Sequence, residues 1–336
     1  MSAPLPPPVR ILQLATAGWM SQVVSAAAEL GVADALAAGP RTVEQIAVDI
    51  DAHAPTLYRL LRACADIELF EERPDRVFAL TDLGDALRSD SPVSLRDFAI
   101  WTGLPAERHT WTQLARSVRT GAPAFEGVHG VPVWDHIREH PDVLGVFDRA
   151  MTQTSRQIIG SIVAAYDFGG LRTLVDVGGG RGALLSAILA ANPDLRGVLY
   201  DQPEVVAESG PVLKEAGVTE RSTTEGGDFF DSVPAGGDAY LLSNIIHDWD
   251  DEPSVRILSH VRAVLPAHGR VLLVEAVLPT DRPALNVKLM DLDMLVLCGG
   301  RQRTEAEFAA LLARAGLRLT RVVPGGHCSV VEAVPA

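Results

Sequence analysis

The hydrophobic positions follow the period of a helix in some parts of this chain and the period of a strand in others. The first hundred residues contain both patterns. Residues 11–38 carry apolar side chains at helical spacing, with Gly31 as the expected stop. Thr42 and Gln45 form a capping-box pair that opens another helix, and a third helix follows it. Residues 68–80 then contain two short strand-like runs joined by a turn. Helix, helix and β-hairpin in this order predict a winged-helix domain over residues 1–100.

The next stretch, residues 101–165, is mostly helical and rich in aromatic side chains. Phe147, Met151 and Ser155 recur every four residues, so they share one face of a helix. That face is either part of a core or the wall of a ligand pocket with Ser155 as a polar contact. The spacing alone favours the core.

The last stretch, residues 166–336, alternates strand and helix signals. At residues 174–185 a short β-branched run is followed by glycines and then by an apolar helical pattern, which is the order of a strand, a tight turn and a helix. The strand-like runs at 317–323 and 328–334 are expected to pair antiparallel. We predict an α/β fold: a doubly wound, Rossmann-like domain preceded by a mostly α-helical winged-helix domain.

Composition disfavours several classes of function. The formal net charge is −14 and the chain has only two lysines, so no basic surface for nucleic acid is predicted. No apolar run approaches the ~20 residues of a membrane span, and the first residues lack the order of a signal peptide. Three scattered cysteines form neither a disulfide framework nor a zinc pattern, and the histidines share no ligand spacing. We therefore expect a cytoplasmic protein that binds no metal, no nucleic acid and no membrane.

A winged helix can also be a DNA-binding head, which would make the chain a ligand-sensing regulator. Residues 1–100 hold eight arginines against fourteen acidic residues, so packing and dimerisation explain this domain better. The nearly uncharged helical pattern over residues 11–28 suits a subunit interface.

The glycine loop is typical of a nucleotide-type binding site. Gly178, Gly179 and Gly180 let the backbone turn sharply and lie close to a ligand, and the helix that follows offers unpaired N–H groups. The loop also satisfies the dinucleotide fingerprint, with Asp201 in place for the ribose hydroxyls. The loop is therefore compatible with two functions, an NAD(P)-dependent oxidoreductase and an enzyme that binds another adenosine ligand.

Three further features bear on that choice. Asp176 directly precedes the glycines, where a carboxylate would repel a pyrophosphate but attract an ammonium or sulfonium group. Asp228 and Phe229 follow a predicted third strand and could meet the amino group and the face of an adenine. His247 lies just beyond a fourth strand. Because ligands bind at the carboxyl ends of strands in an open parallel sheet, these side chains are expected to share one crevice.

Six segments in this order, VDVGGGRG, YDQPEVV, GGDFF, IIHDWDD, VLLVEAVLP and GGRQRTEAEF, resemble the S-adenosylmethionine-dependent O-methyltransferases of the plant caffeate type and their bacterial relatives. The resemblance covers nearly the whole chain. It implies a dimerisation domain at residues 1–100, a helical region lining the substrate pocket at 101–165, and a cofactor-binding catalytic domain at 166–336. It also implies a homodimer that moves the methyl group of S-adenosylmethionine to a hydroxyl of an aromatic, phenolic or polyketide-like small molecule.

The resemblance also implies roles for individual residues, and it favours the pocket over the core for the helix face described above. The implied catalytic residues are His247 as general base, Asp248, and Glu275 as a hydrogen-bond partner of the histidine. The residues expected at the cofactor are Ser155, Asp176, Gly178, Gly179, Gly180, Asp201, Gln202, Asp228, Phe229 and Ser243. The residues expected at the substrate are Phe147, Met151, Asn244, Met290, Asp291, Met294 and Gln302.

The chemistry is consistent with these roles. A phenol has a pKa near ~10, so an imidazole of pKa near ~6.5 is a useful base at neutral pH, and a carboxylate on its other nitrogen fixes the tautomer. Two positions depart from the family pattern. Gln302 stands where relatives usually carry glutamate. Either Glu275 would have to stabilise an imidazolium alone, or the base role of His247 is weaker than in relatives. Ser243 stands where plant members carry a lysine.

Overall fold

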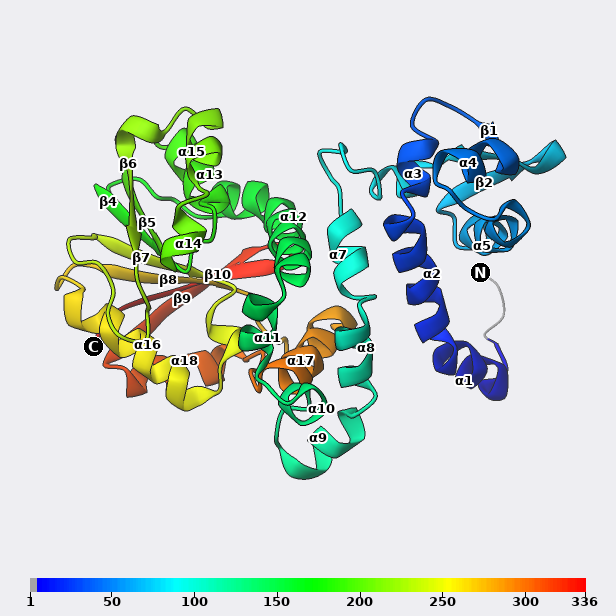
Figure 1. Ribbon diagram of the computed structural model, residues 1–336. Coiled ribbons are helices and arrows are strands. Elements are labelled where there is room, and N and C mark those ends of the chain that lie inside the picture. The colour runs from blue at the N-terminus through cyan, green and yellow to red at the C-terminus, as the bar shows by residue number, and fades with distance from the viewer. Residues whose placement is uncertain (1–4) are drawn as a thin grey trace. The chain divides into compact units, whose positions relative to one another are not determined.

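The computed structural model describes residues 5–336, which divide into two units (Figure 1). One unit comprises the residues through Arg108 together with Ile137–Thr154, and the other comprises His109–His136 and Ser155–Ala336. The long helix α12 (Pro141–Ala165) contributes residues to both units. Residues 101–165, where a helical region was expected, thus belong partly to each unit.

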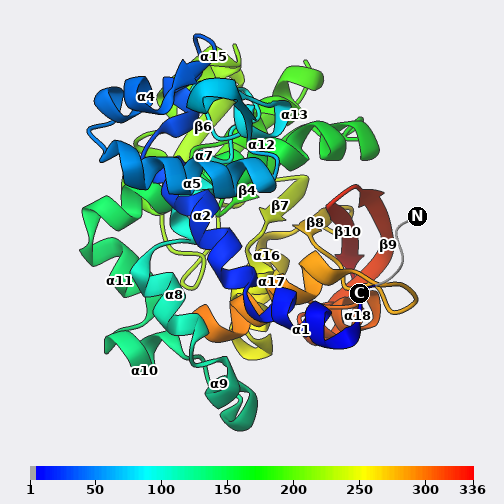
Figure 2. The same cartoon turned by 90° about the vertical axis from the view of Figure 1, so that its right-hand side faces the viewer.

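The first unit contains a small antiparallel sheet and short helices, and its strands run in the order β1-β3-β2. The capping box of Thr42 and Gln45 is present at the start of α4, as predicted. Figure 2 shows α4 and α5 next to each other in this unit. The predicted order of helix, helix and hairpin is confirmed, and the helical pattern at residues 11–38 is interrupted at Gly31, the expected stop. It is also broken at Thr16, which was not expected, so that three helices form. The strands are β1 (Arg41–Thr42), β2 (Phe70–Arg73) and β3 (Val77–Leu80), with the 3-10 turn η1 (Pro74–Arg76) between the last two. The helices are α1 (Pro7–Ala15), α2 (Ala17–Glu29), α3 (Val32–Ala35), α4 (Val43–Asp49), α5 (Ala54–Asp66), α6 (Asp82–Asp85), α7 (Arg96–Trp101) and the start of α8 (Pro105–Trp111).

The second unit is built on a seven-stranded sheet in the order β6-β5-β4-β7-β8-β10-β9. The first five strands in this order pair in parallel, whereas β10 pairs antiparallel with both β8 and β9. The order reverses between β4 and β7, which is where a doubly wound sheet opens a ligand crevice at the carboxyl ends of its strands. The strands are β4 (Thr173–Val177), β5 (Arg196–Asp201), β6 (Ser222–Gly226), β7 (Ala239–Ser243), β8 (Arg270–Glu275), β9 (Leu317–Gly325) and β10 (Cys328–Pro335).

Both faces of this sheet are covered, because successive side chains of each strand point to opposite faces and both sets are apolar. On β4, Leu174 packs on one face with helix α13, whereas Val175 and Val177 pack on the other face with α16 and α18. Figure 1 shows α13 on one side of the sheet and α16 and α18 on the other. The predicted α/β, doubly wound architecture is therefore confirmed.

The remaining helices connect the strands or precede the sheet. A capping box of Thr304 and Glu307 opens α18. Within residues 5–336, no helix has the length and apolarity needed to cross a membrane. The helices are α9 (Leu114–Thr120), α10 (Phe125–His129), α11 (Val133–Glu139), α13 (Ala183–Ala191), α14 (Pro203–Val206), α15 (Gly210–Glu215), α16 (Asp251–Val264), α17 (Leu285–Leu297) and α18 (Glu305–Arg314), with the 3-10 turns η2 (Thr219–Arg221) and η3 (Ile246–Asp248).

Candidate active site

The glycine loop after β4 is shaped by close packing as well as by backbone conformation. Gly178 and Gly180 have φ angles of +70° and +60°, a region that L side chains rarely adopt. A Cβ atom on Gly178 would lie 2.5 Å from the side chain of Ile245 and 3.6 Å from the ring of Phe229. The loops that follow β4, β6 and β7 therefore meet at Gly178, as expected for a crevice at the carboxyl ends of the strands.

Asp201 closes one side of the loop from the end of β5. Its Oδ2 atom accepts a hydrogen bond of 2.8 Å from the N–H of Gly180, and its Oδ1 atom accepts one of 2.7 Å from the N–H of Gln202. The acid is half-buried, so part of its surface is open to a ligand. It is held by the same loop that the sequence assigns to the cofactor.

Asp176 lies beneath the glycine loop with its side chain almost fully buried, at 1% exposure. A Cβ atom on Gly179 would lie 2.6 Å from the carboxyl carbon of Asp176, so the loop backbone covers this group directly. Neither carboxyl oxygen has a hydrogen-bond partner among residues 5–336. Burial, and then the charge of Asp201, raise the pKa of Asp176 to about 7. A buried carboxylate without partners is unfavourable by itself, and a bound cation would compensate it.

An aromatic cluster lies beyond β6. The Phe229 ring packs edge-on against Phe230 at 5.0 Å, and both rings pack against Trp249, at 6.4 and 4.7 Å. Asp228 accepts a hydrogen bond of 2.8 Å from the N–H of Phe230, which fixes the turn that carries Phe229. Sequence reasoning missed Trp249, although a tryptophan two residues after His247 was a signal that could have found it. Trp134 also packs on Trp249, with the ring centres 6.2 Å apart.

His247 lies on the short 3-10 turn η3, four residues beyond the end of β7. The chain leaves the strand through Asn244, whose φ of +53° redirects the backbone. Nδ1 of His247 is 2.8 Å from Oε2 of Glu275, the last residue of β8, and Glu275 has no exposed surface. The other oxygen of Glu275 accepts a hydrogen bond of 2.9 Å from the N–H of Ile246. Glu275 thus fixes both the ring and the backbone of the turn.

The charge on His247 depends on its two acidic neighbours. Nε2 of His247 is 3.4 Å from Oδ1 of Asp248. Burial opposes a charged imidazole, but the Glu275 and Asp248 carboxylates outweigh that effect and raise the pKa of His247 above its ordinary value. Burial in turn raises the pKa of the Asp248 carboxyl. A cation that enters this acidic crevice would favour loss of a proton from His247.

The segment between α17 and α18 runs against the His247 turn. The N–H of Arg301 donates to the carbonyl oxygen of His247 at 2.8 Å, and the N–H of Gln302 donates to Oδ1 of Asp291 at 2.8 Å. The Gln302 side chain is buried, and within residues 5–336 its amide atoms have no hydrogen-bond partner. The Nδ1 bond of His247 is therefore made by Glu275 and not by Gln302.

The other expected substrate residues are spread over two helices. Met294 is buried and Met290 half-exposed on α17, in the same unit as His247. Phe147 and Met151 belong to the other unit, where Phe147 packs edge-on against Trp101 with ring centres 5.1 Å apart. Ser155 lies on α12, and Ser243 is the last residue of β7. Their roles at a ligand stay predictions.

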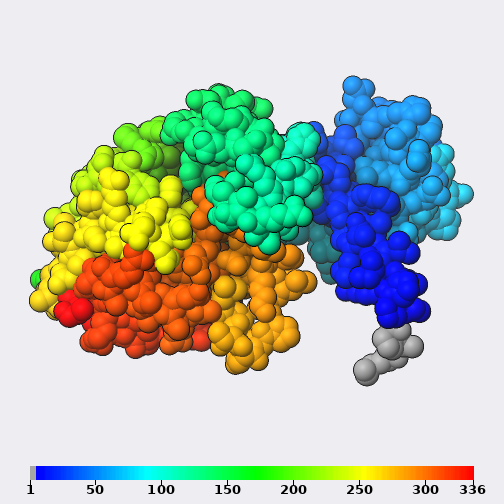
Figure 3. Space-filling view, turned by 90° about the horizontal axis from the view of Figure 1, so that it is seen from below, coloured from blue at the N-terminus to red at the C-terminus, as the bar shows by residue number. Residues whose placement is uncertain are grey.

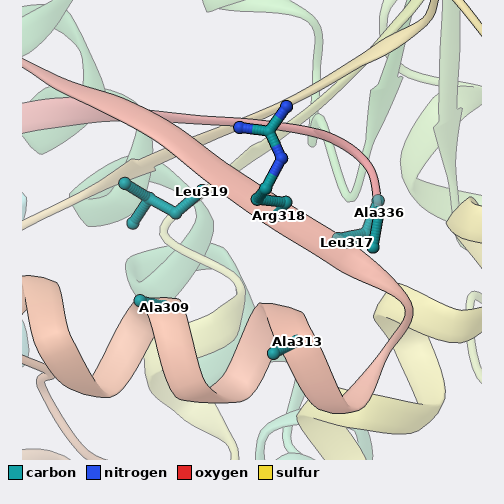
Figure 4. Close-up of a pocket in the computed structure, with 6 residues that line it drawn as sticks. All are labelled: Ala309, Ala313, Leu317, Arg318, Leu319 and Ala336. Atoms are coloured by element: carbon teal, nitrogen blue, oxygen red, sulfur yellow. The ribbon is translucent and has the colours of Figure 1, made fainter.

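A shallow groove at the edge of the sheet involves none of these residues. It lies between α18 and β9 and is lined by Ala309, Ala313, Leu317, Arg318, Leu319 and Ala336 (Figure 4). No group of three or more metal-ligating side chains is found within residues 5–336.

The fold and the crevice define the class of protein. The sheet is doubly wound, with an antiparallel strand next to its edge. A glycine loop over a buried acid and an acid at the end of the second strand of this unit are the features expected where an adenosine compound with a positive charge binds. The buried Asp176 disfavours a pyrophosphate at this loop, and a sulfonium donor matches it. These features are those of a Rossmann-like methyltransferase.

Comparisons with known proteins give the family. Residues 111–318 match the model of the O-methyltransferase domain, and residues 12–90 match that of the O-methyltransferase dimerisation domain. A phenazine O-methyltransferase of Lysobacter antibioticus is 43% identical over 326 residues, which cover 97% of this chain and 95% of that protein. The crystal structure of LaPhzM has a TM-score of 0.94 at 42% identity and covers 99% of this chain and 100% of that one. The chain belongs to the O-methyltransferase family.

The methyl donor follows from the same comparisons. An O-methyltransferase from neocarzinostatin biosynthesis was solved in complex with S-adenosylmethionine and 2-hydroxy-5-methyl naphthoic acid; it has a TM-score of 0.80 at 36% identity and covers 94% of this chain and 96% of that one. S-adenosylmethionine is thus the cofactor of this enzyme, as the sequence predicted, and the dinucleotide alternative is not supported. The match of residues 12–90 to a dimerisation domain likewise favours packing over a DNA-binding head.

Proposed function

We propose that this enzyme methylates a hydroxyl group of an aromatic small molecule and that His247 is the general base. The observation that carries the proposal is the buried pair of His247 and Glu275, 2.8 Å apart, at the carboxyl edge of the sheet. His247 lies on the turn that follows Ile245, and Ile245 is the residue against which the glycine loop packs.

The cofactor fits the residues around the loop. The backbone at Gly178 and Gly180 would lie along the methionine part, and the exposed side of Asp201, with Gln202 next to it, would accept the ribose hydroxyls. Asp228, Phe229 and Trp249 would form the adenine pocket. Asp176 would supply negative charge beneath the loop, where its carboxyl oxygens have no hydrogen-bond partner in the described part of the chain. When bound, S-adenosylmethionine supplies an electrophilic methyl group on a cationic sulfur.

The chain's own residues then have two tasks. Glu275 holds Nδ1–H of His247, which fixes the tautomer and leaves Nε2 to take the proton of the acceptor hydroxyl. The oxygen that His247 deprotonates would then be the nucleophile for the methyl group that bound S-adenosylmethionine supplies. Asp248, 3.4 Å from Nε2, stabilises the imidazolium that results. The rest of the rate comes from holding the oxygen in line with the departing sulfur.

The acceptor class is inferred from relatives and from apolar side chains. The relatives include a phenazine O-methyltransferase and a naphthoate-bound enzyme. Helix α17 carries Met290 and Met294. Asn244 and Gln302, which lie outside this helix, would be the polar contacts. Thioether side chains suit flat aromatic rings, and the buried amide of Gln302 can give or accept a hydrogen bond beside the reacting hydroxyl.

We also propose that the active form is a homodimer joined through the first two helices. Within α1 no side chain is buried, and Ile11, Leu12 and Leu14 are 55–64% exposed. On α2, Trp19 is 74% exposed and Met20 is 54% exposed. Figure 3 shows these helices, in deep blue, at the surface of their unit. Apolar side chains concentrated on one exposed segment are typical of a subunit interface.

The experiment that tests this function is turnover with labelled S-adenosylmethionine over a panel of phenols, hydroxyquinones and hydroxylated polycyclic acids. We expect at least one acceptor to be methylated on oxygen. We expect His247→Ala to bind the cofactor normally but to transfer the methyl group at least ~100-fold more slowly than the wild type. Methylation only of amines would refute the hydroxyl acceptor. Undiminished turnover by His247→Ala would refute the general base.

A further inference from the structure

The guanidinium group of Arg303 is fully buried beneath the His247 turn. Its Nη1 donates to the carbonyl oxygen of Ile246 at 3.0 Å, and its Nη2 donates to the carbonyl oxygen of Trp249 at 3.0 Å. The same group pairs with Oδ1 of Asp251 at 2.8 Å, at the start of α16. One side chain therefore holds the carbonyl groups on both sides of His247 and Asp248.

The backbone around Arg303 adds to this contact. The N–H of Arg301 donates to the carbonyl oxygen of His247 at 2.8 Å. At Gly300 a Cβ atom would overlap the same carbonyl oxygen, so this close approach requires glycine. Three carbonyls of the turn region, those of Ile246, His247 and Trp249, are thus bound by Arg301 and Arg303. Glu275 binds the N–H of Ile246 and the ring of His247 from the other side.

A turn of three residues has few hydrogen bonds of its own, so its geometry depends on such outside partners. Arginine suits this task because its planar fork carries several donors in fixed directions, whereas lysine offers a single point charge on a flexible stem. We infer that Arg303 is a positioning residue for His247: it acts on the base through the backbone of the turn and does not contact the substrate. This inference rests on the proposed role of His247.

The test is Arg303→Lys, which keeps the charge opposite Asp251 but cannot bind both carbonyls. We expect kcat to fall about 10- to 100-fold, because a displacement of ~1 Å in a catalytic group can reduce the rate by that much. The acceptor KM and the Kd for S-adenosylmethionine should stay within about twofold. The pH profile of kcat should also shift, because the contact between His247 and Glu275 loosens with the turn.

The matched control is Arg314→Lys. Arg314 lies on α18, and its Nη1 reaches the same Asp251 side chain at 3.6 Å. Among residues 5–336 its other ion pair is with Glu252, and it forms no hydrogen bond with the turn. We expect wild-type kcat and an unchanged pH profile from this variant. If both lysine variants lower kcat equally, the surroundings of Asp251 are responsible and the inference is wrong.

A second comparison separates this inference from the role of His247. In the His247→Ala background, Arg303→Lys should lower kcat no further, because its effect passes through the missing imidazole. An equal further loss in that background would overturn the inference, and so would wild-type kcat in folded Arg303→Lys. If His247→Ala alone keeps full turnover, the general base fails instead. Arg303→Gln replaces the lysine variant in the same comparison if circular dichroism shows the latter unfolded.

Discussion

Replacing Asp176 by asparagine tests whether the buried acid beneath the glycine loop is there for a cation. The change keeps the shape of the side chain and removes its charge. In the cofactor-free protein the pKa of Asp176 is raised from 3.8 to about 7, mainly by burial. A difference of about 3 pKa units corresponds to about 4 kcal/mol by which the ionised carboxylate destabilises the folded state.

The pH dependence of this effect has a definite sign. Because the folded-state pKa lies above the unfolded value, the folded protein holds the proton more tightly. The stability contributed by that proton is fully present below pH 3.8 and is lost as the pH rises through about 7. Since asparagine does not titrate, Asp176→Asn should be more stable than the wild type at pH 8. We expect about 2 to 4 kcal/mol, after allowance for the unpartnered amide, and the gap should close toward pH 4.

Cofactor affinity should change in the opposite direction. Two opposite charges about 5 Å apart at an effective dielectric constant of about 20 attract by roughly 3 kcal/mol, which is on the order of 100-fold in Kd. Isothermal titration at pH 8 should show this weakening for S-adenosylmethionine and a smaller one for S-adenosylhomocysteine, whose sulfur is uncharged. The wild-type Kd should also improve between pH 5.5 and 8, as Asp176 ionises.

Two results would refute this reasoning. If Asp176→Asn binds S-adenosylmethionine as tightly as the wild type, the carboxylate does not face the cation. If the variant is no more stable than the wild type at pH 8, the carboxyl group has partners or solvent that compensate its charge without a ligand.

Two other predictions follow from the same structure. Glu275→Gln keeps a hydrogen bond to His247 but removes the charge that raises the pKa of the imidazole. We therefore expect kcat to fall about 100-fold or more at unchanged cofactor Kd, and any acidic limb of the pH profile of kcat to move to lower pH. A pH profile identical to that of the wild type would exclude Glu275 as the partner of the base. Ile11→Glu combined with Leu12→Glu should convert a dimer to a monomer, as measured by light scattering. The control Val48→Glu changes an 81% exposed apolar position outside the exposed apolar side chains of α1 and α2, and it should leave the dimer intact. A dimer that survives the double change would place the interface elsewhere.

The parts of the site that lie at strand ends could be predicted from the sequence. In a parallel sheet the carboxyl ends of the strands share one edge, so an acid, a glycine loop or a histidine placed just after a strand must lie near the others. Asp201 bonded to Gly180 and His247 bonded to Glu275 are both contacts between the ends of neighbouring strands.

Contacts made by irregular segments could not be predicted in this way. Arg303 binds the carbonyl of Ile246 across 57 residues of sequence, and no periodic pattern links the two. Gly300 is one of two adjacent glycines, and only the structure reveals that it approaches the carbonyl of His247. The break of the first helical pattern at Thr16 was missed for a related reason, since apolar residues continue on both sides of it.

Gln302 shows how the site can differ from its relatives and still hold its base. The sequence expectation was that an amide at this position would leave Glu275 alone beside His247. In the structure Glu275 already bonds both Nδ1 of His247 and the N–H of Ile246, and the backbone of the turn is held by Arg303 and Arg301. The amide of Gln302 is therefore not needed to orient the base. Because a buried amide without a partner costs about 1 to 3 kcal/mol, an acceptor that bonds to it recovers that free energy, and one that lacks the matching group does not. We propose that the exchange of glutamate for glutamine moves this position from the chemistry of the base to the choice of the acceptor.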